Sequence, residues 1–119
     1  MTTETFTWED FDNAIDIMAS RIRQNKKFRD MKTITGIPRG GLVVAVALSH
    51  KLDSIPVVDY VNRGTLLVDD ISDSGKTLLQ YTGAILTATI HIVPGTSFIP
   101  DIWIKERTAD WVIYPWEVK

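Results

Sequence analysis

The hydrophobic and polar positions of this chain follow a helical period near the N-terminus and strand-like runs further on. Five apolar residues fall at i, i+4, i+7, i+8 and i+11, which places them on one face of an amphipathic helix: Phe11, Ile15, Met18, Ala19 and Ile22. Thr7 stands where an N-cap is expected, and acidic residues follow it in the first turn. We predict that this helix is a scaffold element.

After this helix, apolar runs of strand type alternate with helical segments. We predict strands at 33–37, 55–61, 65–69 and 88–93, and helices at 42–52 and from Gly75 to about Leu86. This alternation is typical of an α/β fold with a mostly parallel central sheet flanked by helices. Ligands bind such folds beyond the carboxyl ends of the strands, where the loops 38–41 and 70–77 are expected to lie.

One connection does not suit a parallel pair of neighbouring strands. Only Val61–Gly64 separates the runs 55–61 and 65–69, whereas a parallel crossover needs about a dozen residues or more. The segment 55–61 is therefore either antiparallel to 65–69 or an edge fragment, and we predict the antiparallel pairing. The tail 100–119 holds three of the four tryptophans, and we expect this aromatic surface to fold over another part of the chain.

Size and composition narrow the class of protein. At 119 residues the chain is expected to form one domain, 1–119, and a hydrophobic content of 45% is typical of a globular protein. The net charge of −2 gives no reason to expect nucleic acid as a partner, and no apolar run approaches the ~20 residues that span a membrane. Cysteine is absent, which excludes disulfides and thiolate metal sites and fits a cytoplasmic location.

The most informative stretch is LLVDDISDSGKTL, residues 66–78. Its apolar run is followed by two adjacent acids, Asp69 and Asp70, and then by the polar loop 73–77, Asp-Ser-Gly-Lys-Thr. The backbone amides and hydroxyls of such a loop suit a phosphate, and the N-terminus of a following helix favours its negative charge. The two carboxylates suit ribose hydroxyls or a hard cation such as Mg²⁺.

A P-loop is excluded, although Gly75-Lys76-Thr77 matches the last three positions of that motif. The P-loop also needs a glycine five residues before this triplet, and that position is Asp70. An acid there would repel the phosphate.

Residues 66–77 resemble instead the 5-phosphoribosyl-1-pyrophosphate (PRPP) motif of type I phosphoribosyltransferases. In that motif an apolar strand, two acids and two spacer residues precede Asp-Ser/Thr-Gly-x-Thr. Two further blocks resemble the bacterial xanthine-guanine subgroup. Residues 38–41, Pro-Arg-Gly-Gly, look like its pyrophosphate loop Ser-Arg-Gly-Gly, and residues 110–117 look like its C-terminal pattern Asp-x-Trp-Ile-x-x-Pro-Trp-Asp. The family's pyrophosphate loop often contains a non-proline cis peptide, so Pro38–Arg39 is the bond to inspect.

The resemblance implies transfer of ribose 5-phosphate from PRPP to a nucleobase nitrogen, with release of pyrophosphate and with Mg²⁺ as cofactor. The implied catalytic residues are Asp73, Asp69 and Asp70, of which the pair Asp69 and Asp70 would also hold the metal, directly or through water. The implied binding residues are Asp73, Ser74, Gly75, Lys76 and Thr77 for the 5′-phosphate, Pro38, Arg39, Gly40 and Gly41 for the pyrophosphate, and Trp111 and Val112 for the base. A core position is the alternative for Trp111.

Two positions depart from the family pattern. The family has a long mobile loop before the PRPP motif that closes over the site, and Val61–Gly64 is all that stands in its place. The purine-specific subgroup also places a lysine against the base at the position of Val93. The resemblance therefore implies a shortened enzyme, with a reduced hood, no long flexible loop and weak turnover, and it leaves the identity of the base open.

Three functions remain at this point. The first is a phosphoribosyltransferase of purine salvage that acts on PRPP and a nucleobase as a homodimer. The second is a regulatory module that binds PRPP or a nucleotide with little turnover, and the third is a structural α/β domain. We interpret the run 105–107 as a solvated face, and both His50 and His91 as structural.

Overall fold

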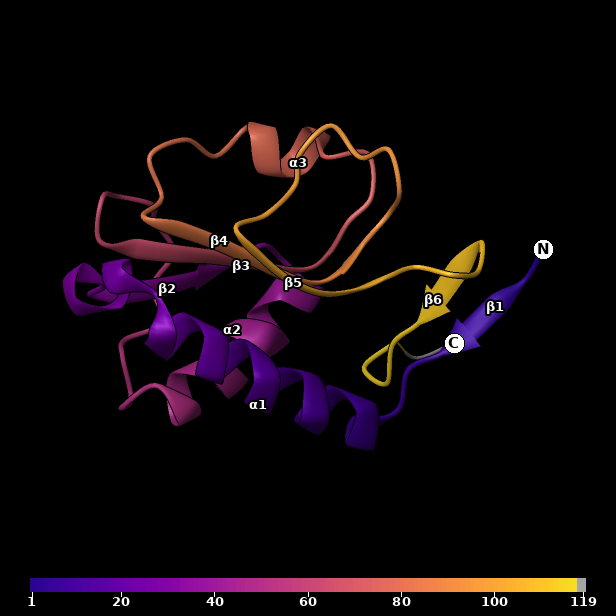
Figure 1. Ribbon diagram of the computed structural model, residues 1–119, viewed down its shortest axis with the longest axis horizontal. Coiled ribbons are helices and arrows are strands. Elements are labelled where there is room, and N and C mark those ends of the chain that lie inside the picture. The colour runs from indigo at the N-terminus through magenta and orange to yellow at the C-terminus, as the bar shows by residue number, and fades with distance from the viewer. Residues whose placement is uncertain (118–119) are drawn as a thin grey trace.

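The computed structural model describes residues 1–117, and its centre is a parallel sheet with helices on both faces (Figure 1). Within this range the sheet has four strands in the order β2-β3-β4-β5, and β1 pairs with β6 in a separate two-stranded sheet. The elements are β1 (Thr3–Thr5), α1 (Trp8–Gln24), the 3₁₀ helix η1 (Lys26–Asp30), β2 (Thr33–Gly36), α2 (Gly40–Lys51), β3 (Thr65–Ser72), α3 (Lys76–Leu79), β4 (Leu86–Ile92), β5 (Ile102–Glu106) and β6 (Trp111–Ile113).

Helix α1 confirms the predicted amphipathic pattern, since all five expected apolar residues are buried. It begins with a capping box. The Thr7 amide donates to the Asp10 carboxylate at 2.9 Å, and the Asp10 amide donates to Thr7 Oγ1 at 3.1 Å. Two amides that lack helical partners are satisfied in this way.

Strand β3 separates two apolar clusters because successive side chains of a strand point to opposite faces. Leu66 and Val68 belong to the main core beneath α1 and α2. Leu67 faces the other way and packs with Ile37 and Leu78 on the side of α3. Figure 1 shows α1 and α2 on one side of the sheet and α3 on the other. Because both faces are covered, β3 reads as a continuous apolar run, as expected for a parallel strand.

The segment 55–61 corrects the prediction of an antiparallel strand. It forms a single parallel bridge, between Val57 and Ile34 of β2. The Ile34 amide donates to the Pro56 carbonyl at 2.9 Å, and the Val58 amide donates to the Ile34 carbonyl at 2.8 Å. The segment is thus the edge fragment that the short turn also allowed, and it lies on the outer side of β2.

The helix after the PRPP-like loop is much shorter than predicted. Helix α3 ends at Leu79, and β4 begins at Leu86. Gly83 lies between them at a φ of 89°, a conformation that breaks a helix and that glycine adopts readily. The apolar residues near 85 belong to the sheet, where the Ile85 amide donates to the Thr65 carbonyl at 2.9 Å.

The C-terminal segment folds back over the N-terminal end of the chain, as the aromatic tail predicted. Strand β6 pairs in parallel with β1, with Thr3 opposite Trp111. Tyr114 and Trp116 stack with their ring centroids 4.8 Å apart, and Trp116 meets the edge of Phe11 on α1. Among residues 1–117, none of the helices combines the length and apolar character that a membrane crossing needs.

Candidate active site

The candidate site lies at the carboxyl ends of β2 and β3, where the strand order reverses. The chain passes from β2 to the edge segment on one side and then to β3 on the other, and ligands of open α/β sheets bind at such a switch point. The loop after β2 is tied to β3, since the Ile37 amide donates to the Val68 carbonyl at 3.0 Å. Both motifs of the sequence therefore lie at one edge of the sheet.

The loop after β2 makes a close contact with the acid pair. A Cβ atom built on Gly40 would overlap the carboxylate of Asp70, so only glycine allows the two to lie this close. Together they line one hollow, whose walls are Arg39, Gly40, Val43, Asp70, Trp116 and Glu117. The Pro38–Arg39 peptide bond is cis, at the bond where the family resemblance directed attention.

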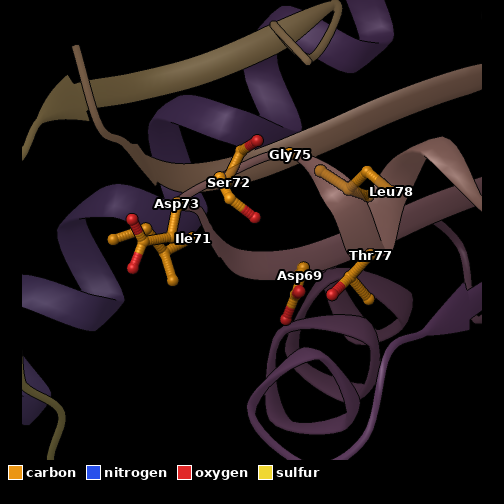
Figure 2. A pocket seen from close by; sticks show the side chains of 8 residues that line it. Asp69, Ile71, Ser72, Asp73, Gly75, Thr77 and Leu78 are labelled. Carbon is orange, nitrogen blue, oxygen red and sulfur yellow. The ribbon is translucent and has the colours of Figure 1, made fainter. Parts of the chain in front are cut away.

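The loop 73–77 forms a second, smaller hollow beside the first. Asp69, Ser74, Gly75 and Thr77 are among the residues that line it, and the side chains of Ser74 and Thr77 are exposed. Gly75 has a φ of 87°, which glycine adopts without strain. Figure 2 shows Asp73 at one end of the labelled group and Asp69 and Thr77 at the other. Because α3 has only four residues, the loop's amides and hydroxyls rather than a helix dipole would hold an anion here.

The two acids at the end of β3 are held close together in a half-buried place. The Asp70 amide donates to Asp69 Oδ1 at 2.8 Å. Burial, and secondly the charge of Asp70, raise the pKa of Asp69 to about 8, and burial likewise raises the pKa of Asp70. Two carboxylates in this setting resist ionising together. A cation or a set of ligand hydroxyls would relieve that repulsion.

A third hollow adjoins the acids on the side of the C-terminal segment. Its lining residues are Asp70, Ile71, Asp73, Arg107, Trp111, Val112, Tyr114 and Glu117. The Trp111 side chain is 51% exposed, whereas Val112 is buried. The exposed indole excludes the alternative of a core tryptophan at position 111. The fold thus brings most of the residues expected at the site to three adjoining hollows around the acid pair. Pro38, Gly41 and Lys76 belong to the same loops but do not line these hollows.

Arg107 is a residue that the sequence analysis missed. We interpreted 105–107 as a solvated face, but the Arg107 side chain is only 18% exposed, and its Nη1 lies 3.7 Å from Asp73 Oδ2. Arg107 follows β5 at the same carboxyl edge of the sheet, and that position was the signal that could have identified it.

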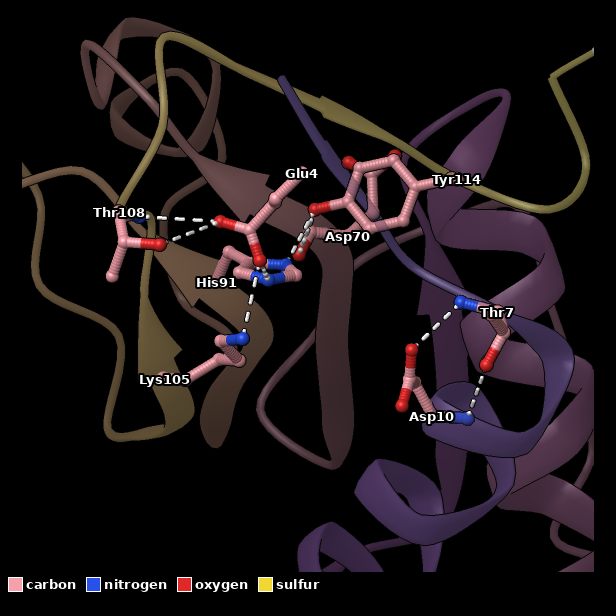
Figure 3. A network of polar contacts seen from close by, with 8 residues as sticks. All are labelled: Glu4, Thr7, Asp10, Asp70, His91, Lys105, Thr108 and Tyr114. Carbon is pink, nitrogen blue, oxygen red and sulfur yellow. Dashed lines mark hydrogen bonds and ion pairs between the residues drawn. The ribbon is translucent and has the colours of Figure 1, made fainter. Parts of the chain in front are cut away.

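A buried polar chain supports the acid pair from behind (Figure 3). The Tyr114 hydroxyl lies 2.8 Å from His91 Nδ1 and 3.3 Å from the carbonyl oxygen of Asp70. His91 Nε2 lies 3.7 Å from the carboxylate of Glu4 on β1, which Lys105 also contacts. Burial lowers the pKa of His91 to about 4, so the imidazole is neutral near pH 7. This histidine is structural, as predicted.

The comparisons with known proteins agree with this geometry. No protein-family model matches the chain. The xanthine-guanine phosphoribosyltransferase of Cereibacter sphaeroides is 31% identical in an alignment of 118 positions, which covers 73% of this chain and 70% of that protein. The chain belongs to the type I phosphoribosyltransferase family. It is a phosphoribosyltransferase of the bacterial xanthine-guanine subgroup. A second relative, the xanthine-guanine phosphoribosyltransferase of Gluconobacter oxydans, is 25% identical, and the alignment covers 95% of this chain and 83% of that enzyme.

A solved structure extends the match to the whole fold of this phosphoribosyltransferase. The purine phosphoribosyltransferase of Pyrococcus horikoshii superposes with a TM-score of 0.82 at 30% identity, covering 100% of this chain and 96% of that one. The alignment with the Gluconobacter enzyme runs over 142 positions, more than the 119 residues of this chain, so that relative carries residues with no counterpart here.

Proposed function

We propose that residues 1–119 form a single phosphoribosyltransferase domain that transfers ribose 5-phosphate from PRPP to a nitrogen of a purine base. The bond from ribose C1 to the pyrophosphate oxygen breaks, the bond from C1 to the base nitrogen forms, and pyrophosphate leaves. The observation that carries this proposal is the meeting of three hollows at the acid pair, because a sugar with a phosphate on each side and a base needs three adjoining subsites.

The 5′-phosphate belongs in the hollow of the loop 73–77. Ser74 and Thr77 present hydroxyls to it, Gly75 allows its backbone to turn sharply, and Lys76 adds one positive charge. Asp73 is the acid of this loop that also lines the hollow beside Trp111. We assign to Asp73 the role of taking the proton that the base nitrogen loses.

The pyrophosphate belongs in the hollow of residues 38–41. Arg39 supplies positive charge, and Gly40 and Gly41 allow the backbone to approach an anion closely. The base belongs in the third hollow, stacked on the exposed indole of Trp111 with its edge toward the backbone of Val112.

Asp69 lines the hollow of the loop 73–77 and Asp70 lines the other two, and we assign both acids to the ribose hydroxyls. They also fit Mg²⁺, because a divalent cation stabilises ionised carboxylates that otherwise repel each other. No group of three or more acidic or histidine side chains among residues 1–117 is arranged to hold a metal ion by itself, so the metal would be held by this pair together with PRPP and water. When bound, the ion neutralises charge on the pyrophosphate. A homodimer in the cytoplasm, also part of the proposal, is compatible with the exposed aromatic surface and the absence of cysteine.

The test is a coupled pyrophosphate-release assay with PRPP, Mg²⁺ and a panel of guanine, xanthine, hypoxanthine and adenine. Base-dependent release that disappears in Asp73→Asn is the expected result. The Asp59→Asn variant, which changes an exposed acid outside the three hollows, is the matched control and should retain activity. Saturable PRPP binding without release on any base would favour the regulatory module, and no PRPP binding would favour a structural domain.

A further inference from the structure

Arg107 occupies an unusual position for a charged side chain. Its amide donates to the Ile92 carbonyl at 2.8 Å, which fixes its backbone beside the end of β4. Its side chain is largely buried, and the contact between its Nη1 and Asp73 Oδ2, at 3.7 Å, is longer than a good charge-assisted hydrogen bond. A guanidinium has five donors, and this loose contact is the one polar contact of the Arg107 side chain within residues 1–117, so the described part of the chain leaves most of the donors available. Withdrawing such a group from water is costly unless its donors are used.

The charges around Arg107 are unbalanced in a way that points to a ligand. The third hollow is lined by three acids, Asp70, Asp73 and Glu117, and Arg107 is the one cation among its described lining residues. Trp111 forms an exposed aromatic wall of the same hollow. A planar ring that stacks on Trp111 would therefore meet Arg107 as the positively charged donor at its edge.

We propose that Arg107 selects the base, by donating to the carbonyl oxygen of an oxopurine that stacks on Trp111. This inference rests on the proposed function and names its substrate class. A guanidinium donates hydrogen bonds and accepts none. An oxopurine offers a carbonyl acceptor, whereas the exocyclic amine of adenine offers donors and would leave both groups unpaired. Adenine would place its amine donor against the guanidinium donor of Arg107, and the site would discriminate strongly against a base that leaves buried polar groups unpaired.

The test measures nucleotide affinity separately from turnover, by calorimetric titration of GMP and AMP into the wild-type chain and two variants. Arg107→Met removes the donors and keeps the length of the side chain. Lys105→Met is the matched control, because Lys105 is a cation two residues earlier that contacts Glu4 and does not line the hollow. We expect wild type to bind GMP at least roughly tenfold more tightly than AMP, and Arg107→Met to bind GMP roughly 10–100-fold more weakly with AMP affinity unchanged. Lys105→Met should behave as wild type.

The outcomes distinguish this inference from the proposed function. Equal losses for GMP and AMP in Arg107→Met, or the same losses in Lys105→Met, would overturn the role of Arg107 even if the wild type releases pyrophosphate. An unchanged GMP affinity with a raised KM for PRPP would also overturn it and assign Arg107 to the pyrophosphate. If the methionine variant fails to fold, Arg107→Gln is the second variant, because its amide both donates and accepts. Loss of the preference for GMP over AMP in that variant would support selection by a group that only donates, whereas an unchanged affinity and preference would overturn it. Failure of wild type to bind either nucleotide would overturn both proposals.

Discussion

The backbone of Gly40 lies directly against the carboxylate of Asp70, so closely that a methyl group at position 40 would occupy the space of Asp70 Oδ2. This contact joins the loop after β2 to the acid pair after β3. The two residues are 30 positions apart in sequence. They can lie this close in space because residue 40 has no side chain.

Gly40→Ala should therefore displace the Asp70 carboxylate and damage catalysis more than stability. We expect kcat/KM for PRPP to fall roughly 100-fold, because small misplacements of positioning groups have large effects on rate. Steady-state kinetics with varied PRPP is the measurement. Gly64→Ala is the control, because a Cβ there meets only side-chain atoms outside the site, those of Lys32 at 3.3 Å and Asn62 Oδ1 at 3.5 Å. Similar activity in both variants would contradict the importance of the Gly40 contact.

Asp69 makes the unliganded protein less stable as the pH rises. Its pKa is about 8 in the folded chain, against 3.8 for an unperturbed aspartate, so between these values the unfolded chain binds fewer protons and stability falls with increasing pH. His91, whose pKa is lowered to about 4, is neutral in both states well above pH 6.5 and does not contribute there.

Asp69→Asn should consequently stabilise the unliganded protein at pH 8, on the order of 2 kcal/mol, while abolishing turnover. Chemical denaturation at pH 7.5 and pH 8.5 is the measurement. Wild type should lose stability across this interval, and the variant should not. An identical loss in both proteins would mean that Asp69 is not the group responsible.

Thr77→Val tests the phosphate loop with a change of nearly equal volume. Thr77 is exposed and lines the smaller hollow, so its hydroxyl is available to a phosphate rather than to the core. We expect KM for PRPP to rise about tenfold through loss of one hydrogen bond to a charged group. Thr82→Val, at an exposed position outside the three hollows at the acid pair, should leave KM unchanged. A wild-type KM in Thr77→Val would place the phosphate elsewhere.

Tyr114→Phe removes the hydroxyl that links His91 to the backbone of Asp70. Because Nδ1 of the buried His91 would then lose its partner, we expect a loss of about 1–3 kcal/mol in the free energy of unfolding. Thermal or denaturant unfolding gives this value, and Tyr60→Phe, at a residue that is 50% exposed, serves as the reference. No difference between the two variants would show that the hydroxyl contributes nothing to stability.

The sequence predicted those elements and site residues that depend on the local order of apolar and polar residues. The spacing of apolar residues located α1, and the order of acids, glycine and hydroxyls located the PRPP-like loop. It failed where short apolar runs can be helix or strand, so the predicted helix from Gly75 to Leu86 included residues that belong to the turn at Gly83 and to β4. Periodicity alone does not separate these cases.

The local sequence pattern also could not predict contacts between residues that are far apart in the chain. The pairing of β1 with β6 joins segments of three residues each at opposite ends of the chain. Arg107 was missed because its neighbours Lys105 and Glu106 are exposed, and only the packing of β5 against β4 brings its guanidinium to Asp73. The composition of 55–61 is that of an ordinary strand. Only the short connection to β3, Val61–Gly64, allowed the edge position to be considered.

The most direct measurement is a crystal structure of the protein with a purine nucleoside 5′-monophosphate bound. The account predicts that the phosphate contacts the backbone and hydroxyls of residues 74–77, that the ribose hydroxyls lie against Asp69 and Asp70, and that the base stacks on Trp111. A phosphate bound at Arg39 instead, or a base directed away from Trp111, would contradict it.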